Sequence, residues 1–173
     1  MKKKVIIGFI LTIIWMVIIF LFSSRSSAEL DVKNSFIVNV LKNIFYPKFD
    51  TFHPNKQEHV LSNISFFVSK SAHYIEYAIL AFFLFFTFAF IKKYGIRYSS
   101  IIIISLLYAI SDEYHQTFSS GRTPRVQDVC IDTLGAITMV LFIEFILTIY
   151  RYKKSRRISW LIHIHIYLKK NLI

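Results

Sequence analysis

The sequence predicts an all-α, polytopic membrane protein in which four transmembrane helices form a small bundle. Three observations predict this class. Hydrophobic residues make up 55% of the 173 residues, they gather in four long runs, and basic residues flank those runs. A bilayer core about 30 Å thick is crossed by roughly 20 apolar residues in a helix. Soluble domains rarely carry runs of this length.

The four runs are expected to form helices at about residues 5–22, 72–91, 98–116 and 130–150. The third run is short and reaches spanning length only if its helix continues through Gln116, which brings Asp112 and Glu113 to the membrane. The fourth run carries Asp132 near one end and Glu144 near the other. It is otherwise strongly apolar, so we expect it to span.

The first run has an alternative interpretation as a signal peptide, because three lysines precede it and Ser26-Ser27-Ala28 follow it. The apolar core of a signal peptide is typically about 7 to 15 residues long, and the run at 5–22 is longer. A transmembrane helix is therefore the favoured prediction.

Positive charge near the ends of the runs predicts the orientation, because Lys and Arg are retained on the cytoplasmic side. Basic residues without acidic ones lie at 2–4, 92–97 and 151–157, whereas the long loop at 23–71 mixes both signs. The loop is expected outside, and the N- and C-termini inside. The net charge of +11 is then explained by membrane orientation, and we predict no nucleic-acid binding. The basic tail at 151–173 is expected in the cytoplasm or along the inner interface.

The outer loop contains two prolines and one segment with helical spacing, and the chain has a single cysteine. Pro47 and Pro54 should interrupt any helix in the outer loop, while the apolar positions of residues 32–44 have helical spacing and predict a short amphipathic helix on the outer leaflet. Cys130 is the single cysteine, so an intrachain disulfide is impossible. At the entry of a helix, Cys130 is better explained as packing than as a nucleophile.

Polar residues of the predicted spans gather at the outer end of the bundle. Lys70, His73, Glu76 and Tyr77 share one helical face through spacings of three and four. The other polar residues expected at this end of the bundle are, in chain order, Asp112, Glu113, Gln116, Arg122, Asp128 and Asp132. Ionisable groups in a membrane interior face one another or a wet cavity. This convergence predicts a polar pocket that opens outward.

Each of these residues also has an ordinary structural explanation. Lys70 or Arg122 could extend to lipid headgroups, Asp128 could cap a helix, and His73 could be a hydrogen-bonded helix residue. Gly135 is expected to be a close-packing position between helices. Taken together, however, the carboxylates would repel one another, so they must be neutralised by basic residues, take up protons or recruit a cation.

Two groups of residues resemble the signature of the VanZ-like family of bacterial membrane proteins. The first is Ser111-Asp112-Glu113 with Gln116, Phe118, Gly121-Arg122, Asp128, Asp132 and Gly135; the second is Lys70-Ser71-Ala72-His73 with Glu76-Tyr77. Phe22-Ser23-Ser24 matches the usual end of the family's first helix. The resemblance covers about residues 22–141, and it departs from the family at Arg25, where Gln is frequent.

The resemblance implies a VanZ-like transmembrane domain at 1–150 in a bacterial cell membrane, with its polar site facing outside. The founding member of the family is associated with low-level resistance to the glycopeptide teicoplanin. That association does not imply a biochemical activity. The resemblance therefore implies membership of the family and a resistance phenotype that can be tested.

Three functions are compatible with these residues. The first is a protein of the cell envelope that binds or modifies an anionic lipid, a cell-wall lipid intermediate or a glycopeptide through Lys70, His73, Glu76, Gln116, Arg122, Asp128 and Asp132. The second is an enzyme in which Asp112 and Glu113 supply general acid and base, with a divalent cation as a further option. The third is a structural partner of other membrane proteins. The sequence leaves the cofactor, the metal and the oligomeric state open.

Overall fold

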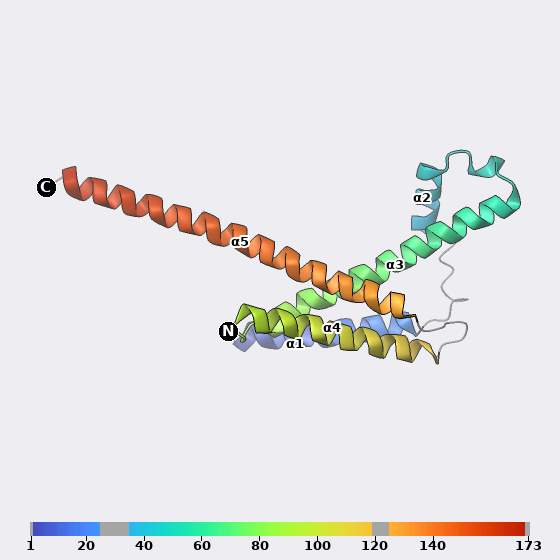
Figure 1. The fold of residues 1–173 in the computed structure, drawn as a ribbon, viewed down its shortest axis with the longest axis horizontal. Helices are drawn as coiled ribbons and strands as arrows, with labels where there is room; N and C mark the ends of the chain where they lie inside the picture. The colour runs from blue at the N-terminus through green and yellow to red at the C-terminus, as the bar shows by residue number, and fades with distance from the viewer. Residues whose placement is uncertain (1, 25–34, 119–124, 172–173) are drawn as a thin grey trace. The chain divides into compact units, whose positions relative to one another are not determined.

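The computed structural model describes residues 2–24, 35–118 and 125–171, with side chains from 3 to 156 within these ranges. Every element in the described ranges is a helix and none is a strand, which confirms the all-α class. The α-helices in the described ranges are labelled α1 to α5 in chain order (Figure 1).

Three of these helices are long and apolar enough to cross a membrane. They are α1 (Lys2–Ser23), α4 (Tyr94–Gln116) and α5 (Val126–Asn171), and their apolar stretches are Lys3–Ser23, Tyr94–Gln116 and Val126–Arg156. Because α4 continues through Gln116, the predicted extension of the third run is confirmed. The length and composition of these helices support three spans of the predicted four.

Helix α3 (Pro54–Thr87) differs from the prediction at both ends. It begins well inside the expected outer loop and stops before residue 91. Pro54 starts the helix instead of breaking it, because at the first position of a helix the fixed φ fits and the missing N–H has no partner to lose. Lys70 and Glu76 interrupt its apolar half, so a fourth span along α3 stays a prediction.

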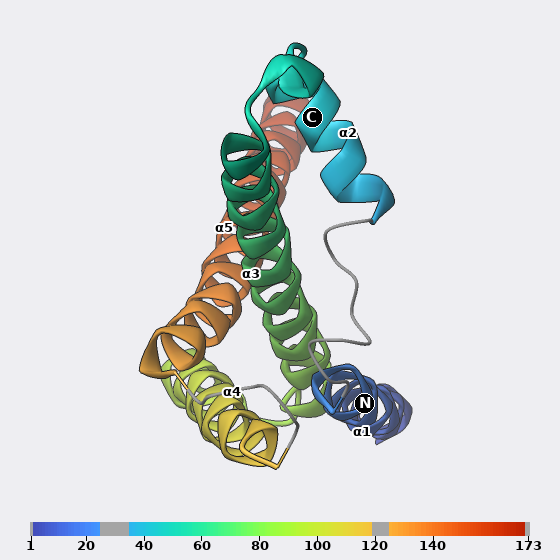
Figure 2. The same cartoon turned by 90° about the vertical axis from the view of Figure 1, so that its right-hand side faces the viewer.

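The predicted amphipathic helix is confirmed as α2 (Phe36–Phe45), which is followed by a short 3-10 helix, η2 (Phe49–Thr51). Ser35 caps α2, since its Oγ accepts a hydrogen bond from the Val38 N–H at 3.3 Å. One face of α2 packs on the first half of α3 (Figure 2). The buried apolar cluster there consists of Val38, Phe49, Val60 and Ile64.

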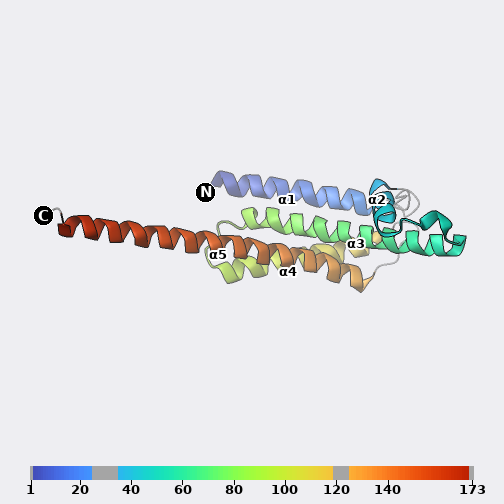
Figure 3. The same ribbon diagram turned by 90° about the horizontal axis from the view of Figure 1, so that it is seen from above.

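Helices α1 and α3 run side by side in opposite directions (Figure 3). Near the start of α1, a Cβ on Gly8 would lie only 2.7 Å from the Thr87 nitrogen at the end of α3, so the two backbones touch there. Two turns further along α1, Trp15 Nε1 donates a hydrogen bond to the Glu76 carbonyl oxygen at 2.8 Å. The second half of α1 therefore lies beside the middle of α3.

Helix α4 runs in the same direction as α1. The Tyr108 hydroxyl donates to the Met16 carbonyl oxygen at 2.6 Å, and the Phe20 and His115 rings lie 4.1 Å apart between centroids. The last turns of α1 and α4 are therefore neighbours at one end of the bundle. The middle of α3 reaches the same end, and α5 begins after the segment that follows α4.

The chain divides into two compact units, residues 1–139 and 140–173, and the boundary falls inside α5. All residues of the predicted polar site belong to the first unit. In the second unit α5 continues as one helix to Asn171, past the predicted end of the fourth span at residue 150. Arg151 pairs there with Glu144 two turns earlier. A domain boundary at residue 150 stays a prediction.

Candidate functional site

The first group of polar side chains lies on α3. His73 and Glu76 are one turn apart, and His73 Nδ1 lies 3.6 Å from Glu76 Oε2. Tyr77, one turn after His73, is fully buried, and its hydroxyl has no hydrogen-bond partner among the described residues. Helical spacing thus presents an imidazole, a carboxylate and a phenol on neighbouring parts of the helix surface.

The second group lies in the last turns of α4. Asp112, Glu113 and Gln116 are only 2%, 5% and 5% exposed. Gln116 Nε2 donates to Asp112 Oδ2 at 3.2 Å, and Glu113 Oε2 accepts a hydrogen bond from the Arg125 backbone N–H at 2.8 Å. The two adjacent carboxylates therefore have different surroundings. One is held within its own helix, and the other binds the chain just before α5.

The first turn of α5 supplies the third group. Lys70 Nζ on α3 lies 2.5 Å from Asp128 Oδ1, and the two side chains are 18% and 13% exposed. Lys70 is therefore paired with a carboxylate of the protein in this conformation, and its contact with headgroups stays an untested alternative. Asp128 lies inside α5, which begins at Val126, so it is not the capping residue. A carboxylate in the first helical turn is also favoured by the helix dipole.

Asp132, one turn after Asp128, joins α5 to both other helices. A carboxylate oxygen of Asp132, a carboxylate oxygen of Asp112 and a ring nitrogen of His73 all lie within 4.8 Å of one another. Asp132 is 1% exposed, and its Oδ1 has no hydrogen-bond partner among the described residues. We call these three residues the His-Asp-Asp cluster.

Contact between the backbones of α3 and α5 explains why the cluster is so close. A Cβ on Gly135 would lie 2.1 Å from the Tyr74 carbonyl oxygen, so only glycine fits there. Gly135 lies almost one turn after Asp132, and Tyr74 follows His73 directly. The prediction that Gly135 is a close-packing position is confirmed, and its contact sets the distance between the two functional side chains.

The cluster is electrostatically costly as it stands. Two carboxylate charges within 4.8 Å of each other repel by at least about 3.5 kcal/mol at an effective dielectric constant of 20. The ammonium of Lys70 is already bound to Asp128. A bound cation or a proton shared by Asp112 and Asp132 would remove this repulsion, so the arrangement suits cation binding or proton transfer.

Nine residues were predicted from the sequence as site residues, and the structure describes eight of them. Arg122 lies outside the described residues, as do Arg25, Gly121 and the signal-peptide motif at 26–28. The cluster brings Asp132 to His73, whereas Asp128 pairs with Lys70. Cys130 is exposed.

Ser105 is a buried polar residue on the same helix as Asp112 that the sequence analysis did not identify. It is fully buried on α4, and its Oγ has no hydrogen-bond partner among the described residues. Its position two turns before Asp112 places it on the same helical face, which was the signal that could have found it.

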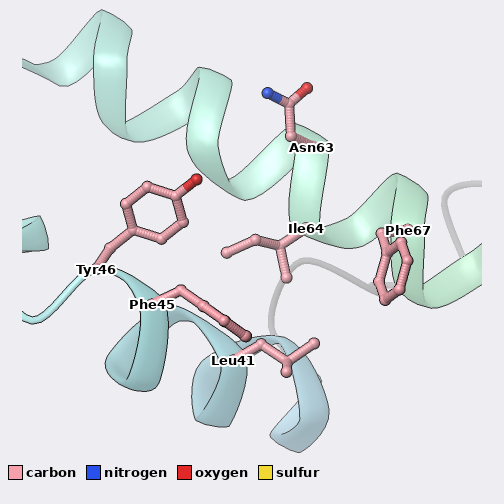
Figure 4. Close-up of a pocket in the computed structure, with 6 residues that line it drawn as sticks. All are labelled: Leu41, Phe45, Tyr46, Asn63, Ile64 and Phe67. Carbon is pink, nitrogen blue, oxygen red and sulfur yellow. The ribbon is translucent and has the colours of Figure 1, made fainter.

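The structure outlines a groove at another place, between α2 and α3 (Figure 4). Its volume is about 370 Å³, and its lining is mainly apolar. The lining residues are Leu41, Phe45, Tyr46, Asn63, Ile64 and Phe67. The groove does not include the His-Asp-Asp cluster, so the predicted polar pocket stays a prediction.

Comparison with known proteins places the chain in context. A family model described as VanZ/LLP1 matches residues 8–160, which is most of the chain and overlaps every described helix. Neither the curated proteins nor the solved structures that were compared gave a match.

Proposed function

The chain belongs to the VanZ/LLP1 family of membrane proteins, and we propose that it acts in the bacterial cell envelope through the polar site at the ends of α1 and α4. In this proposal the site binds or modifies the polar headgroup of an envelope lipid, a cell-wall lipid intermediate or a glycopeptide. The resulting phenotype is a contribution to teicoplanin resistance.

The observation that carries the proposal is the His-Asp-Asp cluster. Three helices each place one ionisable side chain in it, and two of the three side chains are at most 2% exposed. Burying ionisable groups costs free energy, and apolar residues at the same positions would stabilise a small bundle better. A site that binds a ligand or carries out a reaction is the simplest explanation for the free-energy cost of burying these groups.

The outward orientation of the site rests on the distribution of basic residues. Lys92 and Lys93 precede α4, whereas the cluster and the end of α4 lie at the opposite end of that helix. Because Lys and Arg are retained in the cytoplasm, the end of α4 would face outside. An outward site would meet headgroups of the outer leaflet, and antibiotics that have passed through the cell wall.

The chemistry of the site favours certain ligands. Carboxylates of Asp112, Glu113 and Asp132 accept hydrogen bonds, so they suit the hydroxyl and amino groups of a sugar-bearing headgroup. Arg122 and Arg125 would hold a phosphate or carboxylate of the same ligand, because guanidinium groups bind such anions in two-point contacts.

An enzyme is the second candidate function, and the different surroundings of Asp112 and Glu113 favour it. Glu113 accepts from a backbone N–H, while Asp112 faces another carboxylate and an imidazole. Two neighbouring carboxyl groups in unlike environments suit the roles of general acid and general base. In this candidate function, Asp112 and Glu113 are the catalytic residues.

A deletion strain tests the proposal. It is complemented with the wild type, with Asp112→Asn, or with Asp50→Asn, whose position in η2 is exposed. Protein levels in the membrane, teicoplanin susceptibility and lipid profile are measured. We expect Asp112→Asn to accumulate normally and fail to complement, and Asp50→Asn to complement fully. Full complementation by Asp112→Asn would refute the proposal. Loss of the Asp112→Asn protein itself would favour a structural role for the cluster.

A further inference from the structure

We infer that His73, Asp112 and Asp132 form a binding site for a divalent transition-metal ion of the Mn²⁺ or Zn²⁺ type. The inference deepens the proposed function, on which it rests, because the ion would be the group through which the site holds its ligand.

The geometry of the cluster fits such an ion. The candidate ligand atoms come from α3, α4 and α5, and all lie within 4.8 Å of one another. Oxygen and nitrogen ligands bind divalent ions at about 2.0 to 2.6 Å, so ligand atoms on opposite sides of one ion are about 4 to 5 Å apart. Small side-chain movements would bring all three atoms to a common ion.

Two buried polar groups without hydrogen-bond partners among the described residues support a ligand in the cluster. Asp132 is 1% exposed, and its Oδ1 accepts no hydrogen bond from the described residues. The fully buried Tyr77 hydroxyl, one turn after His73 on α3, also has no such partner. Buried polar groups are nearly always hydrogen-bonded or coordinated, so these two point to a ligand.

Neighbouring side chains supply the support that metal ligands usually have. Glu76 Oε2 lies 3.6 Å from His73 Nδ1, and a carboxylate beside an imidazole favours one orientation of the ring. Gln116 Nε2 donates to Asp112 Oδ2 at 3.2 Å and so holds that carboxylate. Both supporting residues lie on the same helices as the ligands that they orient.

The donor set selects the class of ion. One imidazole and two carboxylates suit Mn²⁺ or Zn²⁺ better than Mg²⁺ or Ca²⁺, which prefer oxygen ligands alone. Two carboxylate charges would balance the charge of the ion, which removes the repulsion between Asp112 and Asp132. Three protein ligands leave coordination positions open, and a phosphate or carboxylate oxygen of a headgroup would fill one of them.

Metal binding by the purified full-length protein in lipid nanodiscs tests the inference. After chelation and removal of the chelator, the protein is titrated with Mn²⁺ under electron paramagnetic resonance and with Zn²⁺ by calorimetry. We expect the wild type to bind about one ion per chain, and Asp132→Asn and His73→Gln to lose affinity by about 100-fold or more. Asp50→Asn, the same chemical change at an exposed site, should bind like the wild type.

Circular dichroism and size-exclusion profiles show whether each variant is folded, and two ligand variants on different helices guard against one of them failing to fold. The inference is wrong if the wild type binds no ion, if folded Asp132→Asn and His73→Gln bind normally, or if Asp50→Asn loses binding equally. Absent binding together with a failure of Asp112→Asn to complement would overturn the metal site alone. Intact binding with full complementation by Asp112→Asn would overturn the proposed function.

Discussion

Replacing Gly135 by alanine should separate α3 from α5 and disturb the His-Asp-Asp cluster. The added Cβ would lie 2.1 Å from the Tyr74 carbonyl oxygen, where ordinary van der Waals contacts begin at 3.4 Å, so the backbones must move apart by about 1.3 Å. No side-chain rotation can relieve a clash with backbone. Overpacking of this kind costs about 1 to 3 kcal/mol.

Gly95→Ala is the matched control, because a Cβ there meets nothing within 4 Å. Alanine is favoured over glycine in a helix by at most about 1 kcal/mol, and both variants share this gain. The difference between them therefore isolates the clash. We expect Gly135→Ala to be less stable than Gly95→Ala by about 1 to 3 kcal/mol.

Unfolding of both variants in mixed detergent micelles measures this difference in free energy, and Mn²⁺ titration of the same samples measures the cluster. Gly135→Ala should also bind Mn²⁺ more weakly, because Asp132 is displaced from His73. Equal stability and equal Mn²⁺ affinity of the two variants would refute the close approach of α3 and α5.

Two further predictions concern the ion pair and the orientation. Lys70→Met and Asp128→Asn should each destabilise the protein, and the double variant should be destabilised by less than the sum of the two. In a double-mutant cycle we expect a coupling energy of about 1 to 3 kcal/mol. Additive effects would mean that the ion pair does not form in the membrane. On a Cys130→Ser background, a membrane-impermeant thiol reagent applied to intact cells should label Thr117→Cys at the end of α4 but not Tyr94→Cys at its start, and the reverse pattern would contradict an outward-facing site.

Much of the fold could be predicted from the sequence because bilayer length and hydrophobic spacing leave few alternatives. The apolar run of α1 and the continuation of α4 through Gln116 follow from these two constraints. The first half of α3, residues 54–71, could not be found in this way. It is too polar for a membrane-length argument, and Pro54 marks a helix start as readily as a helix break.

The gathering of the polar residues at one end could be predicted, but their pairing could not. Helical spacing on α5 puts both Asp128 and Asp132 near α3. The choice between them as the partner of His73 depends on how far α5 is shifted along α3. That shift is set by the backbone contact between Gly135 and Tyr74, which only the structure gives.

Cross-linking of α3 to α5 in native membranes tests the central claim most directly, since the account depends on His73 and Asp132 being neighbours. His73→Cys and Asp132→Cys are combined on a Cys130→Ser background and treated with a short bifunctional thiol reagent. The account predicts an intramolecular cross-link for this pair and none for Asp132→Cys with Phe86→Cys, because Phe86 lies about 20 Å further along α3 than His73. The account would be contradicted if the first pair gives no cross-link although both of its thiols are accessible to labelling. Equal cross-linking of the two pairs would also contradict it.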